Sequence, residues 1–132
     1  MNTAVDSSVL LAIVKGEASA EAWMNRLISA RENGGLLACE AMWAETRQIY
    51  SSREAHAKAM EAFGLQFSPL LPATAALAGE IHQAYRRAGG KRERILADFL
   101  IGAHALIQAD QLATADDGYL RPHFRQLKVL KL

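Results

Sequence analysis

Short apolar runs alternate with longer amphipathic segments along the whole chain. The apolar runs are bounded by Gly, Pro or polar residues, which is typical of strands. The amphipathic segments repeat apolar side chains every three or four positions, as at Ala20, Trp23 and Leu27, which predicts helices. We expect strands at residues 3–5, 36–39, 65–71, 111–114 and 127–132.

Helices are expected in the connections between these strands. Ser7 and Ser8 supply capping residues before the first helix, and Gly34-Gly35 is a stop signal after the second. The expected helices cover residues 9–13, 17–32, 41–50, 53–63, 72–87 and 95–108, and residues 115–124 form a loop with a short helix. Strands that alternate with helices predict an α/β fold with a parallel sheet covered on both faces.

Size and composition limit what the chain can be. With 132 residues, of which 51% are hydrophobic, residues 1–132 are expected to form a single domain. Fifteen Lys and Arg against 14 Asp and Glu leave a net charge of +1, so a polyanion would need local basic patches or metal ions.

The cellular environment can also be predicted from the sequence. The single cysteine, Cys39, excludes an intramolecular disulfide, which fits a reducing compartment, and it is expected to be a buried thiol. Residues 1–14 are apolar but contain Asp6 and no basic leader, so we expect neither a signal peptide nor a membrane span. A cytoplasmic protein without membrane contact is expected.

Two acidic residues follow predicted strands. Asp6 comes directly after the first strand, and Asp116 comes just after the fourth. Ligands of parallel sheets bind outside the carboxyl ends of the strands, near the point where strand order reverses, so both carboxylates are candidates for a site. Two alternatives stay open, because Asp6 could simply cap the following helix and Asp116-Asp117-Gly118 also fits an ordinary turn.

Two further acids lie within predicted helices. Asp98 is surrounded by apolar residues, where an unpaired charge would cost several kcal/mol by order of magnitude. A place in the first turn of its helix would offset part of that cost, and a divalent cation would offset more. Glu45 has Arg47 and Arg53 nearby, so an ordinary surface position is its alternative.

The four acids together suit a hard divalent cation. Carboxylate oxygens with water completing an octahedron are typical of Mg²⁺, and Mn²⁺ would serve equally well by ligand type. The candidate acids are Asp6, Glu45, Asp98 and Asp116.

Basic residues converge in sequence on the helix that carries Asp98. Such residues can bind backbone phosphates without reading base sequence, although a solvated helix end is the alternative. They are Arg86, Arg87, Lys91, Arg92 and Arg94.

Histidine and tryptophan are expected to be structural. The histidines show no metal-ligand spacing among themselves, and His104 is expected to be a core histidine with a satisfied hydrogen bond. Trp23 and Trp43 are expected to pack in the core or to line a groove for a partner.

Four segments, taken in order, resemble PIN-domain nucleases, and in particular the VapC-like toxins of type II toxin–antitoxin modules. Residues 4–10 resemble the family's opening strand with its first acid, and Trp43-Ala44-Glu45 resembles its second. Residues 92–106 resemble the helix with the third acid, and residues 112–119 the closing strand with its Thr-x-Asp motif. The resemblance covers essentially the whole chain.

The resemblance implies a PIN-like three-layer sandwich with a central parallel five-stranded sheet. It implies an endoribonuclease that uses Mg²⁺ or Mn²⁺ and water to cleave RNA phosphodiester bonds. Asp6, Asp98 and Asp116 would be metal ligands. Glu45 would bind the metal through water or orient the nucleophile, with Glu40 as its competitor for this role.

Several neighbours of these acids are assigned supporting roles. Ser7 and Thr114 could hydrogen-bond the carboxylates or the scissile phosphate, or could be structural. Asp117 is a spare ligand or, as we favour, a solvated turn residue. Whether one or two metal ions bind stays open.

The resemblance also implies partners: a cognate antitoxin that blocks the acidic cleft, and a second copy in a homodimer.

Other classes of α/β protein fit the sequence less well. Rossmann and P-loop nucleotide binding are excluded because no Gly-rich turn follows the first strand. An aspartate-nucleophile phosphatase would have a second Asp where Ser8 stands. The remaining alternative is a non-catalytic RNA- or protein-binding module with the same fold. The sequence does not identify which RNA is cut.

Overall fold

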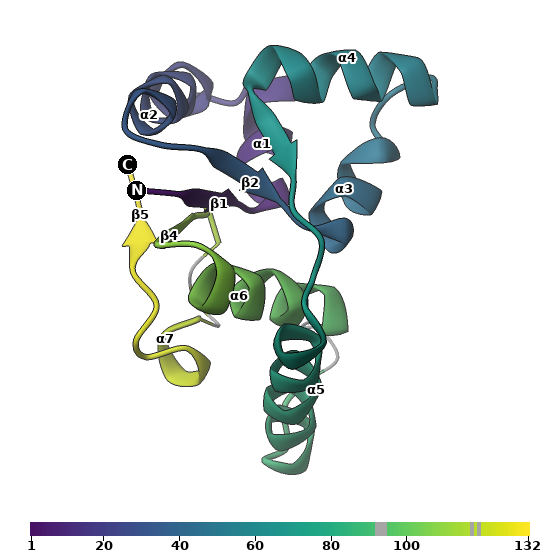
Figure 1. Ribbon diagram of the computed structural model, residues 1–132, viewed down its shortest axis with the longest axis vertical. Helices are drawn as coiled ribbons and strands as arrows, with labels where there is room; N and C mark the ends of the chain where they lie inside the picture. The colour runs from purple at the N-terminus through teal and green to yellow at the C-terminus, as the bar shows by residue number, and fades with distance from the viewer. Residues whose placement is uncertain (92–94, 117, 119) are drawn as a thin grey trace.

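The computed structural model describes residues 1–91, 95–116, 118 and 120–132. Within these residues, five strands form one sheet in the order β3-β2-β1-β4-β5 (Figure 1). Every neighbouring pair is parallel, which confirms the predicted class. The strands are β1 (Thr3–Val5), β2 (Leu36–Ala38), β3 (Leu65–Phe67), β4 (Gln111–Ala113) and β5 (Val129–Leu130).

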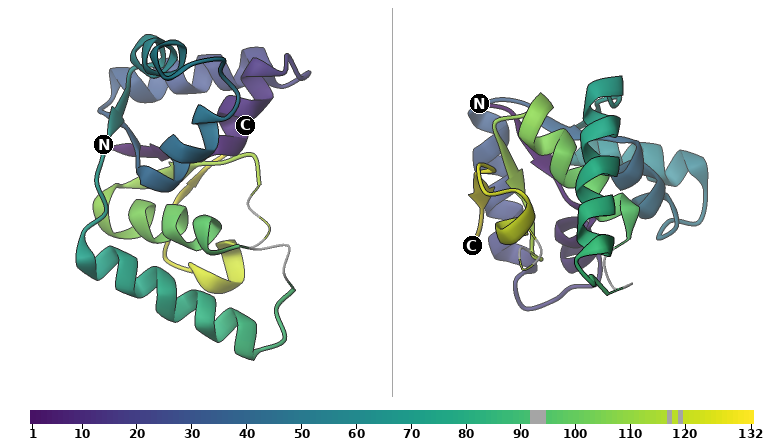
Figure 2. Two further views of the ribbon diagram at one scale, coloured as in Figure 1. Left: turned by 90° about the vertical axis from the view of Figure 1, so that its right-hand side faces the viewer. Right: turned by 90° about the horizontal axis from the view of Figure 1, so that it is seen from below.

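Helices cover both faces of this sheet, so the molecule has three layers. Helices α1, α2 and α4 lie on one side of the strands and α5, α6 and α7 on the other, as Figures 1 and 2 show. The helices are α1 (Ser7–Val14), α2 (Ala20–Glu32), α3 (Glu40–Arg47), α4 (Arg53–Phe63), α5 (Pro72–Arg87), α6 (Leu96–Gln108) and α7 (Leu120–His123).

The core lies on both faces of the central strands. All residues of β1 and β4 are buried, as is usual for parallel strands with helices on each side. Helices α1, α3 and α4 contribute Leu10, Met42 and Met60 to the core, while α6 contributes Phe99 and Ile101. Cys39 is a buried free thiol, as predicted.

The sheet topology defines a place for a site. The chain proceeds from β1 outward to β2 and β3 and then crosses back to β4 on the other side of β1. Strand order therefore reverses between β1 and β4, and their carboxyl ends flank the crevice where ligands of such sheets bind. Asp6 directly follows β1 at this crevice.

The segment after β3 differs from its prediction. We expected a strand over residues 65–71, but β3 ends at Phe67. Side chains from α3 and α6 bind the backbone beyond it, because Glu40 accepts a hydrogen bond from the Leu70 N–H (2.9 Å) and Gln108 accepts one from the Leu71 N–H (3.0 Å). These bonds replace those that a longer strand would make to a neighbour.

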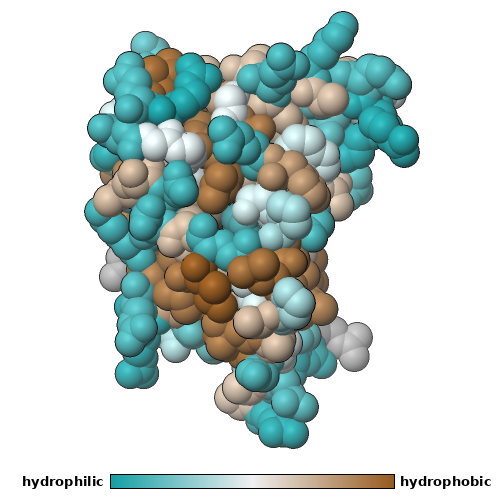
Figure 3. Space-filling view, in the orientation of Figure 1, coloured by the Kyte–Doolittle hydropathy of each residue, from teal (hydrophilic) through white to brown (hydrophobic). Residues whose placement is uncertain are grey.

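Apolar side chains also gather on the surface where α5 meets α6 (Figure 3). Leu71 at the start of α5 is 52% exposed, and Ile107 near the end of α6 is 44% exposed. Exposed apolar patches of this kind often mark interaction surfaces. No helix in the described part of the chain is long and apolar enough to cross a membrane.

Candidate functional site

The site is built around Asp6 at the end of β1. Its backbone N–H donates to the Ala113 carbonyl (2.9 Å), which fixes it against β4, and its side chain is only 6% exposed. Although Asp6 occupies the N-cap position of α1, its side chain makes no capping hydrogen bond, so the capping alternative is wrong. The carboxylate Oδ2 instead accepts hydrogen bonds from Ser8 Oγ (2.7 Å) and Thr114 Oγ1 (2.8 Å).

The two hydroxyls connect Asp6 to the loop after β4. Thr114 Oγ1 accepts a hydrogen bond from the Asp116 N–H (3.0 Å), and Ser8 Oγ accepts one from the Ala115 N–H (3.0 Å). The orientation of the Asp6 carboxylate and the path of this loop therefore depend on each other. Sequence reasoning assigned Ser8 only to helix capping, although its position two residues after Asp6 is a spacing at which a local side-chain bond forms.

Helix α3 brings Glu45 to the same place. Ser7 Oγ donates a hydrogen bond to Glu45 Oε1 (3.0 Å), and thus connects the start of α1 to α3. Glu40, the competing candidate, lies at the start of α3, where its carboxylate binds the Leu70 N–H. The structure therefore places Glu45 beside the other acids and engages Glu40 in the loop between β3 and α5.

Asp98 lies in the first turn of α6, a place that offsets part of the cost of its charge. Its Oδ2 accepts a hydrogen bond from the Ile95 N–H (3.1 Å), one of the backbone groups that a helix N-terminus leaves without an intrahelical partner. The positive end of the helix dipole also favours a carboxylate here. The next residue, Phe99, is buried, and its packing in the core fixes the position of the first turn of α6.

The acids interact electrostatically with one another. Burial raises the pKa of Asp6, the hydrogen bonds from Ser8 and Thr114 oppose that rise, and the charges of Asp98 and Asp116 add to it. Burial likewise raises the pKa of Glu45, Ser7 opposes the rise, and Asp6 and Asp98 add to it. Four carboxylates from separate parts of the sequence therefore share one region of negative charge.

This donor set fits a divalent cation. Among the residues that the structure describes, no three His, Cys, Asp or Glu side chains already form a metal-binding group. The neighbouring negative charges nevertheless add to the raised pKa values of Asp6 and Glu45, and a bound cation would relieve that repulsion. Hard oxygen ligands with water in the remaining positions suit Mg²⁺ or Mn²⁺.

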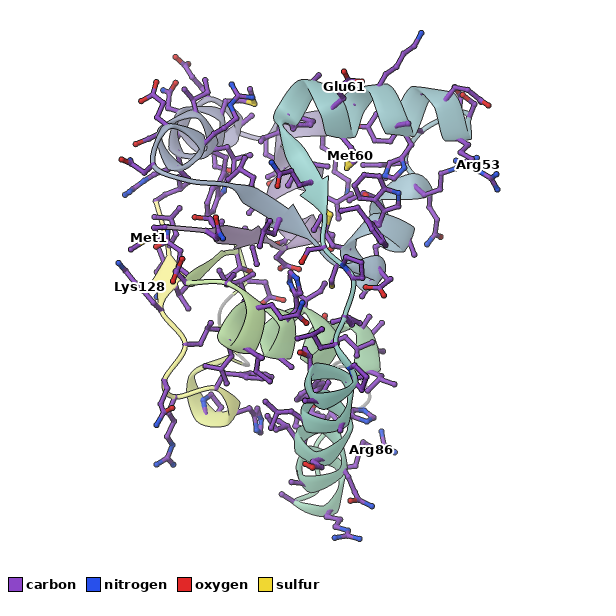
Figure 4. All side chains as sticks on the ribbon, viewed as in Figure 1. Met1, Arg53, Met60, Glu61, Arg86 and Lys128 are labelled. Carbon is purple, nitrogen blue, oxygen red and sulfur yellow. The ribbon has the colours of Figure 1, made fainter. Side chains whose placement is uncertain are left out.

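The predicted basic residues are only partly described. Arg86 and Arg87 are exposed in the last turn of α5, and Arg86 points away from the helix (Figure 4). Lys91 is exposed, and its carbonyl accepts a hydrogen bond from the Tyr85 hydroxyl. Arg92 and Arg94 lie outside the described residues, and so does Asp117.

The predicted structural residues are found in packing roles. His104 is buried, and its Nε2 lies 2.9 Å from Ser68 Oγ, which confirms a core histidine with a satisfied hydrogen bond. Trp23 is buried in the core. Trp43 packs edge-to-face against His56 and Phe67.

The fold and the acidic crevice define a class of protein: the chain belongs to the PIN domain family, whose model matches residues 3–124. This confirms the family that the sequence motifs indicated. The chain is 36% identical to Ribonuclease VapC10 of Mycobacterium tuberculosis over 127 residues, which cover 94% of this chain and 89% of that protein.

Solved structures share the fold at lower sequence identity. VapBC2 from Rickettsia felis, bound to a DNA fragment from its promoter, has a chain that matches with a TM-score of 0.77 and 17% identity, covering 100% of this chain and 99% of that one. A chain of VapBC-1 from nontypeable Haemophilus influenzae matches with a TM-score of 0.72 and 16% identity, covering 99% of this chain and 98% of that one.

Proposed function

We propose that this protein is an endoribonuclease that uses Mg²⁺ or Mn²⁺ to cleave RNA phosphodiester bonds, and that it is the toxin of a type II toxin–antitoxin pair. One observation carries the proposal: the charges of Asp98 and Asp116 act on Asp6, and those of Asp6 and Asp98 act on Glu45. These acids belong to a PIN-family chain that is 36% identical to Ribonuclease VapC10. Residues 1–132 act as one nuclease domain in this proposal.

Asp6, Asp98 and Asp116 are the proposed ligands of the cation. When bound, a divalent cation supplies an activated water and neutralises charge that develops on the phosphate. Ser8 and Thr114 both donate to Oδ2 of Asp6, so they hold this carboxylate in one orientation and leave Oδ1 directed elsewhere.

Glu45 is the proposed proton acceptor. Ser7 binds its Oε1, which leaves Oε2 to take the proton of the attacking water. Burial raises the pKa of Glu45 above its ordinary value, which makes the carboxylate a stronger base for this proton. Ser7 keeps the carboxylate in place while the proton moves.

Basic residues beyond the acids are proposed to bind the RNA backbone. Lys91, Arg86 and Arg87 are exposed at the end of α5, which precedes the helix that carries Asp98. Arg92 and Arg94 are proposed for the same role from their place in the sequence. With a net charge of only +1, the chain depends on such local patches.

Two partners belong to the proposal. A cognate antitoxin is one of them, which the likeness to chains of VapBC structures supports, and we place it over the acidic crevice. A second copy of the chain would form a homodimer, and the exposed apolar surface around Leu71 and Ile107 supports such a contact. The buried free thiol of Cys39 supports a cytoplasmic location.

The test is cleavage of a panel of structured RNAs by purified, partner-free protein. The protein is assayed with Mg²⁺, with Mn²⁺ and with EDTA, and Asp6→Asn and Asp98→Asn serve as controls for contaminating nuclease. We expect metal-dependent cleavage that falls by more than about 100-fold in each variant, because losing even a supporting partner of a metal site costs about 10- to 100-fold. Folded wild-type protein that binds no divalent metal and cuts nothing would instead indicate a non-catalytic binding module.

A further inference from the structure

A second concave site lies between α3, α4 and the end of β3. Its volume of about 360 Å³ is within the range of roughly 300–1,000 Å³ that is usual for small-ligand pockets. Its lining includes Glu40, Trp43, Arg47, Arg53, His56 and Phe67.

This pocket lies at the same edge of the sheet as the acids. Because all strands are parallel, their carboxyl ends meet at one edge, where Asp6 follows β1 and Phe67 ends β3. Only β2 separates these two strands, and neighbouring strands are about 4.8 Å apart, so the ends of β1 and β3 are about 10 Å apart along the edge. Helix α3 contributes to both, with Glu45 at the acids and Trp43 in the pocket.

The pocket has aromatic walls with fixed orientations. The Trp43 ring lies 5.2 Å from His56 and 5.3 Å from Phe67, with interplanar angles of 78° and 82°. His56 is buried beneath it, whereas Phe67 is 47% exposed although it is a large apolar side chain. The pocket therefore presents an aromatic surface to solvent at the rim and is closed by packed rings behind.

The charges at the rim favour an anion. Arg47 is held by a hydrogen bond from its Nη1 to the Tyr50 carbonyl (3.0 Å). Arg53, the first residue of α4, extends outward from the body of the protein (Figure 4). Among the residues that the structure describes, the lining contains one carboxylate, Glu40, which binds the Leu70 N–H, and the two arginines outnumber it.

We infer that this pocket is a subsite that holds one unstacked base of a single-stranded RNA whose backbone crosses the four carboxylates. An aromatic surface flanked by arginines suits a flat ring attached to a phosphate, because bases stack on aromatic side chains and guanidinium groups bind the backbone. The geometry identifies Phe67 as the stacking residue and Arg53 as a phosphate contact. This inference rests on the proposed function, since the pocket would bind part of the same RNA substrate.

The test is binding of a fluorescein-labelled single-stranded hexaribonucleotide of mixed sequence to the full-length protein in EDTA, followed by anisotropy. Phe67→Leu keeps an apolar side chain but removes the ring, whereas Phe67→Tyr keeps the ring. We expect Phe67→Leu to weaken binding about five- to tenfold and Phe67→Tyr to bind within about twofold of wild type. Arg53→Gln should weaken binding and reduce the salt dependence by about one released ion.

Matched controls come from the exposed face of α2, away from the pocket. Ile28→Ala removes a 40% exposed apolar side chain, and Arg26→Gln removes one exposed charge. Both should bind the oligonucleotide like wild type. Equal binding of the oligonucleotide by wild type, Phe67→Leu and Arg53→Gln would overturn the subsite. A change in the oligomeric mass of these variants without a change in binding would also overturn it, because the pocket would then be a protein interface.

The binding experiment and the cleavage experiment test the subsite and the nuclease separately. If the wild type cleaves RNA but binding does not depend on the Phe67 ring, the subsite is wrong and the nuclease stands. If the wild type does not cleave but binding depends on this ring, the nuclease is wrong and the subsite stands. Absence of any oligonucleotide binding overturns the subsite whatever the cleavage result.

Discussion

At the scale of single residues, two hydroxyl groups decide how the central carboxylate is held. Thr114 and Ser8 both donate to the same oxygen of Asp6, and each also accepts a backbone N–H from the loop after β4. Removing either hydroxyl therefore affects two groups at once, the carboxylate and an N–H. In a buried site such a loss is costlier than on the surface, because water does not replace the missing partner freely.

We expect Thr114→Val to reduce RNA cleavage by about 10- to 100-fold, the usual effect of losing a side chain that supports a metal ligand. Valine has nearly the same shape, so the folded structure should persist while the affinity for Mn²⁺, measured by titration calorimetry, falls. Thr3→Val is a matched control, because Thr3 is also a buried threonine, and its hydroxyl accepts a hydrogen bond from Gln111 in the neighbouring strand β4. That variant should lose stability and keep its specific activity. Equal loss of activity in both variants would contradict the role of Thr114.

The sequence identified the acids better than it identified their partners. Asp6 was recognisable because it follows a strand, and Asp98 because an apolar helix rarely contains an unpaired charge. The capping alternative for Asp6 could be decided only from coordinates, since it depends on whether the side chain turns toward α1 or toward Thr114. Ser8 was missed because a serine after an aspartate at a helix start has an ordinary explanation.

At the scale of elements, the boundary furthest from its prediction is the end of β3. Leu65, Phe67, Leu70 and Leu71 are apolar, but Ser68-Pro69 follows Phe67 directly, and Pro69 has no N–H to donate to a neighbouring strand. The groups that bind the backbone beyond it are Glu40 and Gln108, which lie 30 and 37 residues away from their partners. Local patterns do not predict such contacts, but Pro69 was a local signal that the prediction did not use, so the strand was overestimated while neighbouring helices were placed within a few residues.

Contact between α6 and the segment after α7 depends on the absence of a side chain at Gly102. A Cβ atom there would lie 2.7 Å from the ring of Phe124, which is itself buried. We expect Gly102→Ala to destabilise the fold by about 1–2 kcal/mol, because overpacking of a core outweighs the better helix propensity of alanine. The free energy of unfolding in urea measures this effect.

The control for that substitution lies on the neighbouring helix. Gly79 is exposed within α5, and a Cβ atom there would meet nothing within 4 Å. Gly79→Ala should therefore stabilise the protein by up to about 1 kcal/mol through helix propensity alone. If both variants were stabilised equally, the packing of Phe124 against α6 would be looser than the structure shows.

At the scale of the whole molecule, the order of elements was predictable but their convergence was not. Alternation of strands and helices predicted a parallel sheet, and the reversal of strand order after β3 creates the crevice. The motif resemblance indicated which acids belong together. Their actual proximity depends on how α3 and α6 pack, and this packing brings Glu45 and Asp98 within electrostatic range of Asp6.

Buried histidines make the stability of the whole fold depend on pH. Burial lowers the pKa of His56, and the Arg47 charge lowers it further, while burial also lowers the pKa of His104 against the opposing charge of Glu40. Well above pH 6.5, both imidazole rings are neutral in the folded protein and in the unfolded chain. As the pH falls through 6.5, the unfolded chain takes up protons that the folded chain does not, so the free energy of unfolding decreases until the lower folded pKa values are reached.

His56→Gln isolates one of these rings, because glutamine does not titrate and can still bond to Thr46, whose Oγ1 lies 3.0 Å from the His56 Nε2. We expect the stability advantage of the wild type over this variant to shrink below pH 6.5, at a rate of at most about 1.4 kcal/mol per pH unit for one proton. Urea denaturation at several pH values between 5 and 8, roughly the range in which histidine titrates, measures the difference in the free energy of unfolding between wild type and His56→Gln. The raised pKa values of Asp6 and Glu45 act in the opposite direction but occur in both proteins, so they cancel in this comparison. A difference that stays constant with pH would mean that His56 takes up its proton equally in the folded and unfolded states.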